Sequence, residues 1–149
     1  MIKLNRTEER DMWNIKIKLS LAAIFVFSAL SACAFRAQDI ILTDAKMATA
    51  VDENLMPIKI TDLFPKETAK VSCWIKWRDS KINAQLLAKW HYVTDDTHIL
   101  DYLFTIPKKE GMGSVTLSMP EGKKLPPGLY KVDLVSGNRV LKSLTFKIE

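Results

Sequence analysis

The sequence predicts an all-β protein: a single antiparallel β-sandwich of about seven strands, preceded by an N-terminal signal-peptide helix. From Met47 onwards apolar residues alternate with polar ones at a period of two, the spacing of half-buried strands. Clusters of Gly, Pro, Asn and Asp interrupt this alternation at short intervals, as turns do. The chain has 149 residues, 48% hydrophobic and 26% charged, which fits one globular domain and excludes a disordered, collagenous or coiled-coil chain.

The first residues have the layout of an export signal. Residues 1–18, with five basic and three acidic side chains, precede fourteen uncharged residues, 19–32. As a helix this apolar run spans about 21 Å, too short for the ~30 Å hydrocarbon core of a bilayer. The pattern therefore predicts a cleavable signal peptide, and an uncleaved membrane anchor is the alternative. Because Met12 begins a more ordinary basic segment, translation from Met12 is a further hypothesis.

The end of the apolar run is more specific. Leu30-Ser31-Ala32-Cys33 resembles the lipobox of bacterial lipoproteins, which consists of an aliphatic residue, two small residues and a cysteine. The resemblance implies cleavage after residue 32 and attachment of diacylglycerol to Cys33, the new N-terminus, together with further acyl chains such as palmitate. Two or more chains anchor a protein stably, so we expect an exported protein with the membrane as a partner. Ala34, in place of an aspartate, favours the outer membrane in a Gram-negative cell.

The exported part, residues 33–149, is mildly basic. Its 17 Lys and Arg residues outnumber its 14 Asp and Glu residues, and the excess is spread along the chain. Lys108-Lys109 and Lys123-Lys124 are interpreted as solvated loop lysines, with weak attraction to anionic lipids or polymers as the alternative. No aromatic residues are interleaved with basic clusters, so nucleic acid is not an expected partner. Residues 33–46 are predicted to be a tether of at most ~45 Å, and residues 47–149 are predicted to be the domain.

Each expected strand has one apolar row, because each sheet of a sandwich buries one face. One or two strands are expected between Met47 and Asp62, Gly111-Met112-Gly113 is expected to be a turn, and Ser136-Gly137-Asn138 is expected to join the last two strands as a hairpin. The other expected strands and their apolar rows are 69–77 (Val71, Cys73, Ile75, Trp77), 84–92 (Leu86, Ala88, Trp90, Tyr92), 98–106 (Leu100, Tyr102, Phe104, Ile106), 114–119 (Val115, Leu117, Met119), 129–135 (Tyr130, Val132, Leu134) and 139–148 (Val140, Leu144, Phe146, Ile148).

The segment Pro127-Gly128-Leu129-Tyr130-Lys131-Val132 resembles the start of strand F in immunoglobulin-like domains. The resemblance extends over about residues 60–149 to small extracytoplasmic modules of bacteria, and it implies an immunoglobulin-like sandwich but no reaction. It implies that the Tyr130 hydroxyl caps a corner of the fold and that Trp90 is the core tryptophan of strand C. Cys73 falls on strand B, but Val132 replaces the second core cysteine. We therefore expect apolar packing alone to hold the core, at about 25 cal/mol per Å² buried.

One turn gathers side chains that can bind a metal. His91 and His98 stand at the two shoulders of a hairpin whose turn contains Asp95 and Asp96. Imidazoles together with a carboxylate suit zinc or copper, so these four residues are a candidate metal site. Paired aspartates are also common in turns, and a solvated hairpin is the alternative. A metal-dependent hydrolase that uses this turn is accordingly the alternative function.

The expected strand at 69–77 contains two further residues of interest, Trp74 and Cys73. Trp74 is expected to point outwards, where it is a candidate contact for a protein partner unless a neighbouring segment covers it. Cys73 is expected to be a buried small hydrophobic residue, with an intermolecular disulfide as the alternative.

The sequence contains no recognisable catalytic constellation. Gly-x-Ser-x-Gly, P-loop and His-Glu-x-x-His motifs are absent from it. The predicted function is therefore non-catalytic: a membrane-anchored lipoprotein that binds an envelope protein or polymer, or a structural subunit of a larger surface assembly. No cofactor is expected.

Overall fold

A computed structural model describes residues 39–149, so the predicted signal peptide, the predicted lipobox and Cys33 lie outside the described residues. In the part of the chain that it covers, no helix is long and apolar enough to span a membrane. The elements of this part are β1 (Ile41–Val51), β2 (Pro57–Ile60), β3 (Leu63–Phe64), β4 (Lys70–Arg78), β5 (Gln85–Tyr92), the 3-10 helix η2 (Val93–Asp95), β6 (Thr97–Thr105), β7 (Gly111–Ser118), β8 (Gly128–Ser136) and β9 (Arg139–Ile148).

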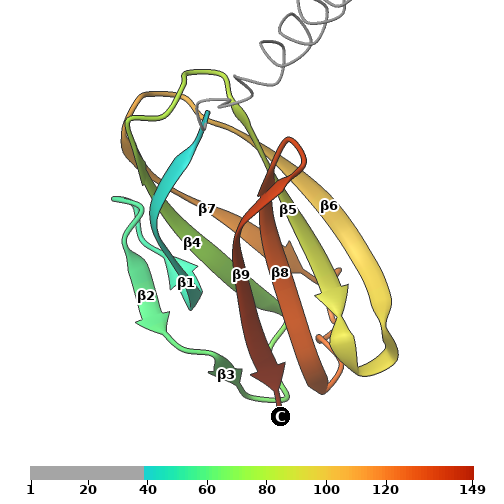
Figure 1. Ribbon diagram of the computed structural model, residues 1–149. Helices are drawn as coiled ribbons and strands as arrows, with labels where there is room; N and C mark the ends of the chain where they lie inside the picture. The colour runs from blue at the N-terminus through green and yellow to red at the C-terminus, as the bar shows by residue number, and fades with distance from the viewer. Residues whose placement is uncertain (1–38) are drawn as a thin grey trace, which may run out of the picture. The chain divides into compact units, whose positions relative to one another are not determined.

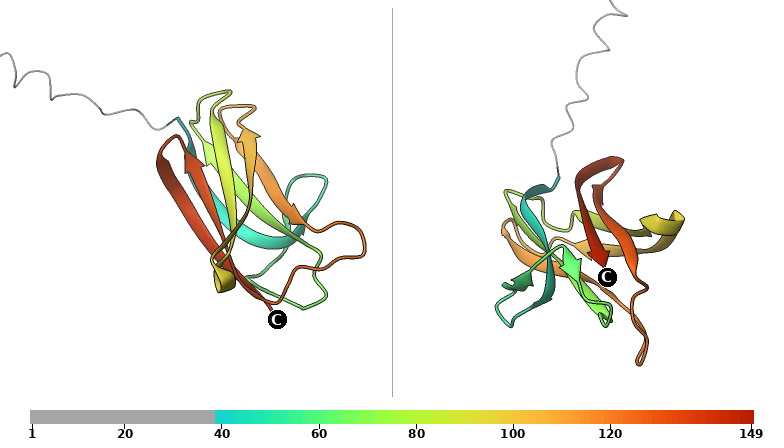
Figure 2. Two further views of the ribbon diagram at one scale, coloured as in Figure 1. Left: turned by 90° about the vertical axis from the view of Figure 1, so that its right-hand side faces the viewer. Right: turned by 90° about the horizontal axis from the view of Figure 1, so that it is seen from below.

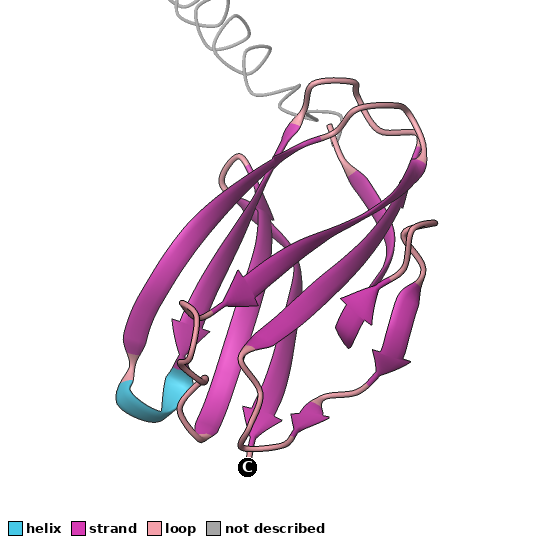
Figure 3. Ribbon diagram, turned by 180° about the vertical axis from the view of Figure 1, so that it is seen from behind, coloured by secondary structure: helices cyan, strands magenta, loops and turns pink. Residues whose placement is uncertain are grey.

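The strands form two sheets that pack face to face (Figure 1). One sheet has the strand order β2-β1-β4-β7, and the other has the order β3-β9-β8-β5-β6. The paired strands are antiparallel except β3, which runs parallel to the end of β9. Figure 2 shows the two layers from the side and from below, and Figure 3 shows that strands make up most of the domain. The prediction of an all-β sandwich is thus confirmed.

The six strands predicted after residue 69 are confirmed as β4 to β9. The hairpin predicted at Ser136-Gly137-Asn138 joins β8 to β9, and Gly137 has a φ of 58° there. This left-handed conformation is one that glycine adopts without a steric penalty, so the hairpin follows from the local sequence.

The first strand differs from the prediction. β1 begins at Ile41, within the segment assigned to the tether, and Ile40 is already completely buried. A register shift between Leu42 and Asp44 disturbs the alternation there. The Asp44 side chain accepts a 2.9 Å hydrogen bond from the backbone N–H of Ala45. The predicted domain start at Met47 is therefore wrong, since the domain includes Ile40.

β7 also begins earlier than predicted. Gly111 and Gly113, which were expected in a turn, belong to the strand. A Cβ atom on Gly113 would lie 2.8 Å from the Phe104 ring, and one on Gly111 would lie 2.9 Å from the Trp77 ring. Glycine is needed at both positions because an aromatic ring packs directly over the backbone and leaves no room for a side chain. Glycine within a strand often marks such a close approach.

The core lies between the two sheets and contains the inward rows of both. Cys73 of β4 and Val132 of β8 are both completely buried in it, and Cys73 is a free thiol. Trp90 is completely buried as well, as the resemblance implied. The Phe146 ring packs against Trp90 and Tyr130, with ring centroids 6.1 and 5.0 Å apart. Such aromatic packing supplies a large share of core burial.

Val140 was predicted to face the core, but it lies on the outer face of β9. Val135 pairs with Val140 while Leu134 pairs with Lys142, so β9 has one extra residue, Leu141, at a β-bulge. Leu141 packs against the core. Because one extra residue reverses which side chains face inwards, the side chain of Val140 is directed outwards and is 55% exposed.

Candidate functional site

The outer faces of the two sheets differ in how they are covered. Trp74 lies on the outer face of the β2-β1-β4-β7 sheet, because its neighbours Cys73 and Ile75 belong to the core between the sheets. Its side chain is only 5% exposed, and its Nε1 donates a 2.7 Å hydrogen bond to the carbonyl oxygen of Leu55 in the loop between β1 and β2. The candidate partner contact at Trp74 is therefore wrong, since the chain's own loop satisfies and covers the indole.

The other sheet is open on its outer side. Figure 1 shows β9, β8, β5 and β6 in front, with no other described element lying over them. Antiparallel sheets commonly have one solvated face, which is then lined by polar side chains. Apolar side chains grouped on this face therefore indicate a surface that another molecule could cover.

An apolar row crosses all four strands of this open face. Val140 of β9 lies opposite Val135 of β8, Val135 lies opposite Leu87 of β5, and Leu87 lies opposite Leu103 of β6. Residues directly opposite one another project from the same face of a sheet. Val140 and Leu103 are 55% and 51% exposed, whereas Val135 is largely covered by its neighbours without belonging to the core cluster. We refer to Leu87, Leu103, Val135 and Val140 as the apolar row.

A polar row borders the apolar row. Lys89 of β5 lies between Asp133 of β8 and Asp101 of β6, and Ser143 of β9 lies opposite Asp133. The Asp133 carboxylate is 2.8 Å from Lys131 Nζ and accepts a 2.5 Å hydrogen bond from Ser143 Oγ. Partial burial opposes ionisation, but the hydrogen bonds from Lys131 and Ser143, with the nearby positive charge, outweigh it and hold the pKa of Asp133 below its usual value.

The two histidines of the predicted metal site lie next to this polar row. His91 and His98 are directly opposite each other, with ring centroids 5.2 Å apart. His98 Nε2 is 3.5 Å from Asp101 Oδ1. Within residues 39–149, no three His, Cys, Asp or Glu side chains are grouped closely enough to hold a metal ion. The hairpin thus brings two imidazoles together but does not bring Asp95 and Asp96 to them, because both aspartates lie in the turn itself at and after η2.

Burial makes the thiol of Cys73 a poor nucleophile. Burial raises its pKa to about 12, and the reactive form of cysteine is the thiolate. The interpretation of Cys73 as a small core residue agrees with its position.

The apolar row escaped the sequence analysis, although the sequence contains a signal for it. Leu87 follows Leu86, and Val135 follows Leu134, so two strands carry consecutive apolar residues where strict alternation would place a polar one. Two such doublets in adjacent strands indicate apolar side chains on both faces of the sheet. Their alignment into one row depends on register, which the sequence alone does not give.

No family model matches the chain, and no curated protein matches it. Solved structures do. An immunoglobulin-like protein from Pseudomonas aeruginosa matches with a TM-score of 0.54 and 10% identity, over 76% of this chain and 99% of that one. The domain has an immunoglobulin-like fold. At this identity the likeness establishes the fold alone.

Two weaker structural similarities were also found. A Pseudomonas fluorescens alkylpurine DNA glycosylase bound to DNA has a TM-score of 0.47 and 11% identity, over 78% of this chain and 32% of that one. A CARDB domain from Pyrococcus furiosus in complex with di-metal ions has a TM-score of 0.39 and 14% identity, over 80% of this chain and 96% of that one. Their DNA and metal ions belong to those proteins.

Proposed function

We propose that the chain is a lipoprotein, anchored through Cys33, whose immunoglobulin-like domain binds a protein of the cell envelope without catalysis. The binding surface is the open face of the β9-β8-β5-β6 sheet. The observation that carries this proposal is the apolar row, whose members Leu103 and Val140 are exposed to solvent. On the outer face of the other sheet, by contrast, the β1–β2 loop covers Trp74.

The chemistry of the open face suits a protein partner. Covering the exposed parts of Leu103 and Val140 stabilises a complex by about 1 kcal/mol for each side chain. The neighbouring charges Lys89, Asp101 and Asp133 form the polar border that sets orientation and specificity. The row is aliphatic and its border carries both signs of charge, which favours a protein over a charged envelope polymer.

The lipobox and the export core that precedes it support the anchor. In a Gram-negative cell the proposed location is the outer membrane, because Ala34 follows the cysteine. The geometry does not favour the alternative of a metal-dependent hydrolase at the 91–98 turn. Of its four predicted metal ligands, only His91 and His98 lie together among the described residues.

The anchor is tested by the intact mass of the protein purified from membranes, beside a Cys33→Ala variant. We expect a mass equal to residues 33–149 plus acyl chains, and an unlipidated product from the variant. An unmodified full-length mass would refute the anchor.

The binding face is tested by a photo-crosslinking side chain placed at Val140 in intact cells. Ile60 on β2 of the other sheet is the matched control, because both residues are 55% exposed. We expect one discrete crosslinked protein from position 140 and none from position 60. Equal products from both positions, or a product made of two copies of this chain, would contradict the proposed heterologous partner.

A further inference from the structure

The described chain begins at one end of the sandwich and is fastened there. The Asp39 carbonyl accepts a 2.7 Å hydrogen bond from the backbone N–H of Lys81, and Ile40 is completely buried. Ser80 Oγ accepts a 2.9 Å hydrogen bond from the backbone N–H of Ile41. These contacts fix the point at which the described chain enters the domain.

The same end carries an excess of positive charge. The loop between β4 and β5, the loop between β6 and β7 and the β8–β9 turn lie there, as the 2.9 Å hydrogen bond from Ser80 N–H to the Lys109 carbonyl shows for the first two. The exposed cations of these loops and of the strand residues beside them are Arg78, Lys81, Lys108, Lys109 and Arg139, which we call the basic end. The acidic residues there are Asp39, Asp79 and Glu110.

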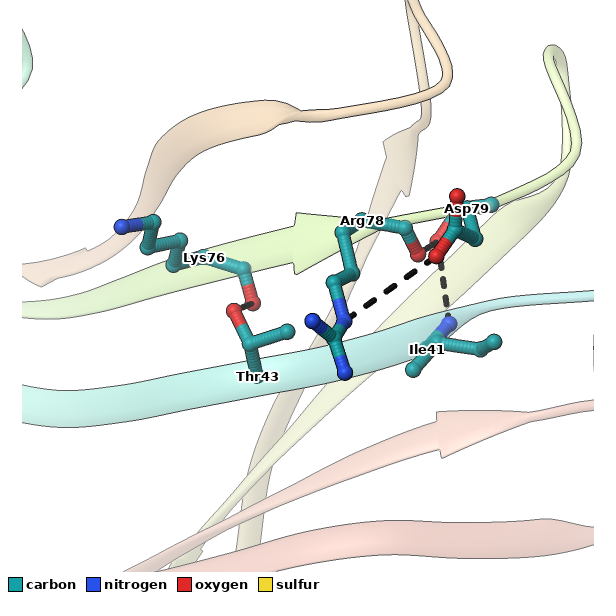
Figure 4. A network of polar contacts seen from close by, with 6 residues as sticks. Ile41, Thr43, Lys76, Arg78 and Asp79 are labelled. Atoms are coloured by element: carbon teal, nitrogen blue, oxygen red, sulfur yellow. Dashed lines mark hydrogen bonds and ion pairs between the residues drawn. The ribbon is translucent and has the colours of Figure 1, made fainter.

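The cations of the basic end are mostly free of ion pairs. Arg78 faces Asp79 at 4.0 Å, with both side chains largely exposed (Figure 4). Among residues 39–149, no carboxylate lies within ion-pair distance of Lys81, Lys108, Lys109 or Arg139. Their charge is therefore available to an external anion.

The opposite end has the reverse balance. The loops before β4, after β5 and before β8, together with the first residue of β4 and the residue after β9, carry five acidic and four basic side chains. These are Glu67, Asp95, Asp96, Glu121 and Glu149, and Lys66, Lys70, Lys123 and Lys124. The mild basicity expected from composition is thus concentrated where the chain reaches the domain.

We propose that the basic end binds the anionic phospholipid headgroups of the membrane that holds the Cys33 lipid. This inference rests on the proposed function. Ile40 follows Cys33 by seven residue steps, which span at most about 25 Å. This is less than the length of a ten-residue strand, about 33 Å. The basic end is therefore confined close to the headgroups. Cations within about 8 Å of the surface are attracted to it at physiological salt.

The β4–β5 loop adds an apolar contact to this surface. Ile82 follows Lys81 in that loop and is 48% exposed. An apolar side chain beside cations is suited to the headgroup boundary, where the apolar part is buried and the charges meet phosphate. With the basic end on the membrane, the strands point away from it and the apolar row faces sideways, towards proteins of the same membrane.

The test uses the full lipidated protein with Ile82→Cys labelled by an environment-sensitive fluorophore. Cys33 is blocked by its lipid and Cys73 is buried, so the label is selective. The protein is placed in phosphatidylcholine vesicles, with or without about one-third phosphatidylglycerol. We expect blue-shifted emission and quenching by a lipid-borne quencher only with phosphatidylglycerol. Salt at about 1 M, where the Debye length is ~3 Å, should abolish both effects.

Two charge-reversal variants locate the contact. Lys81→Glu/Lys108→Glu/Lys109→Glu removes three cations of the basic end, and Lys66→Glu/Lys123→Glu/Lys124→Glu makes the same change in net charge at the opposite end. Each cation near an anionic surface favours binding about fivefold, so the loss of three cations alone should shift the binding equilibrium about a hundredfold towards release. The three added carboxylates are repelled by the surface and should increase this shift further. The second variant should retain the quenching.

The outcomes separate this inference from the anchor. A label that stays solvent-exposed in both kinds of vesicle, or an equal loss in the two variants, would overturn the membrane contact even when the mass shows a lipidated Cys33. A mass without acyl chains would overturn the anchor and this inference together. Equal melting temperatures of the two variants show that the comparison is not a folding defect.

Discussion

The hydroxyl of Tyr130 donates a 2.7 Å hydrogen bond to the carbonyl oxygen of Pro126, four residues earlier in the chain. The bond joins the loop before β8 to the strand itself, while the Tyr130 ring is stacked on Phe146 at an interplanar angle of 12°. One side chain thus links a corner of the fold to the centre of the core, in the role that the immunoglobulin-like resemblance implied.

Tyr130→Phe should destabilise the domain by about 1 kcal/mol, the usual net contribution of one hydrogen bond. The ring and its packing are kept, and only the hydroxyl is lost. Urea unfolding followed by tryptophan fluorescence measures the change. Tyr102→Phe is the control, because Tyr102 is exposed and makes no hydrogen bond through its hydroxyl among the described residues. Equal losses in both variants would argue against the corner.

Gly128→Ala should destabilise the domain more than Gly122→Ala. Both glycines have positive φ, 146° and 76°. A Cβ on Gly128 would lie 2.6 Å from the hydroxyl oxygens of Tyr92 and Thr94, whereas nothing lies within 4 Å of one on Gly122. We expect about 1 kcal/mol for the backbone strain at Gly122 and at least about twice that at Gly128, where the steric clash is added. Comparable denaturation midpoints for the two variants would contradict this.

Asp133 should make the domain sensitive to acid. Its folded pKa lies below the unfolded value, so it stabilises the fold at pH values above the unfolded value of 3.8, and this contribution is lost as the pH falls through the folded pKa. Asp133→Asn should therefore cost on the order of 1 kcal/mol at neutral pH and flatten the loss of stability below about pH 4. Glu121→Gln, in an exposed loop, is the control. Parallel stability curves for wild type and Asp133→Asn between pH 2 and 7 would disprove the assignment.

Cys73 should not react with iodoacetamide at pH 8 while the domain is folded. Burial raises its pKa to about 12 and removes it from solvent, so both the thiolate and access to it are lacking. In urea the thiol should alkylate at the rate of a free cysteine, as mass spectrometry would show. Rapid labelling under native conditions would mean that β4 opens readily or that the thiol is exposed.

The sequence predicts the inward-facing residues correctly in strands whose apolar residues alternate regularly along the core face. In β4 and β8 the inward rows that contain Cys73 and Val132 follow simple alternation, and both were assigned correctly. Two of the errors in the strands occur at irregular backbone. The register shift between Leu42 and Asp44 interrupts the alternation in the first half of β1, and the extra residue Leu141 turns Val140 outwards. Bulges depend on pairing with a neighbouring strand, so a single strand's sequence does not reveal them.

The candidate site was predicted less well than the fold, for a related reason. The hairpin correctly places His91 opposite His98, because a hairpin brings its two shoulders together. Whether Trp74 is exposed depends on a loop that is distant in sequence and carries Leu55, and no local pattern indicates that contact. The apolar row likewise requires the register of four strands, which is a property of the assembled sheet.

The parallel pairing of β3 with β9 also constrains when the domain can form. Phe64 of β3 and Ile148 of β9 are register partners, and the core rings of Phe64 and Phe146 contact each other. During synthesis from the N-terminus, none of these contacts can form until β9 has been made. Because β3 and β9 are far apart in the sequence, their pairing is expected to form slowly. The β3 edge of this sheet is therefore expected to be completed late in folding.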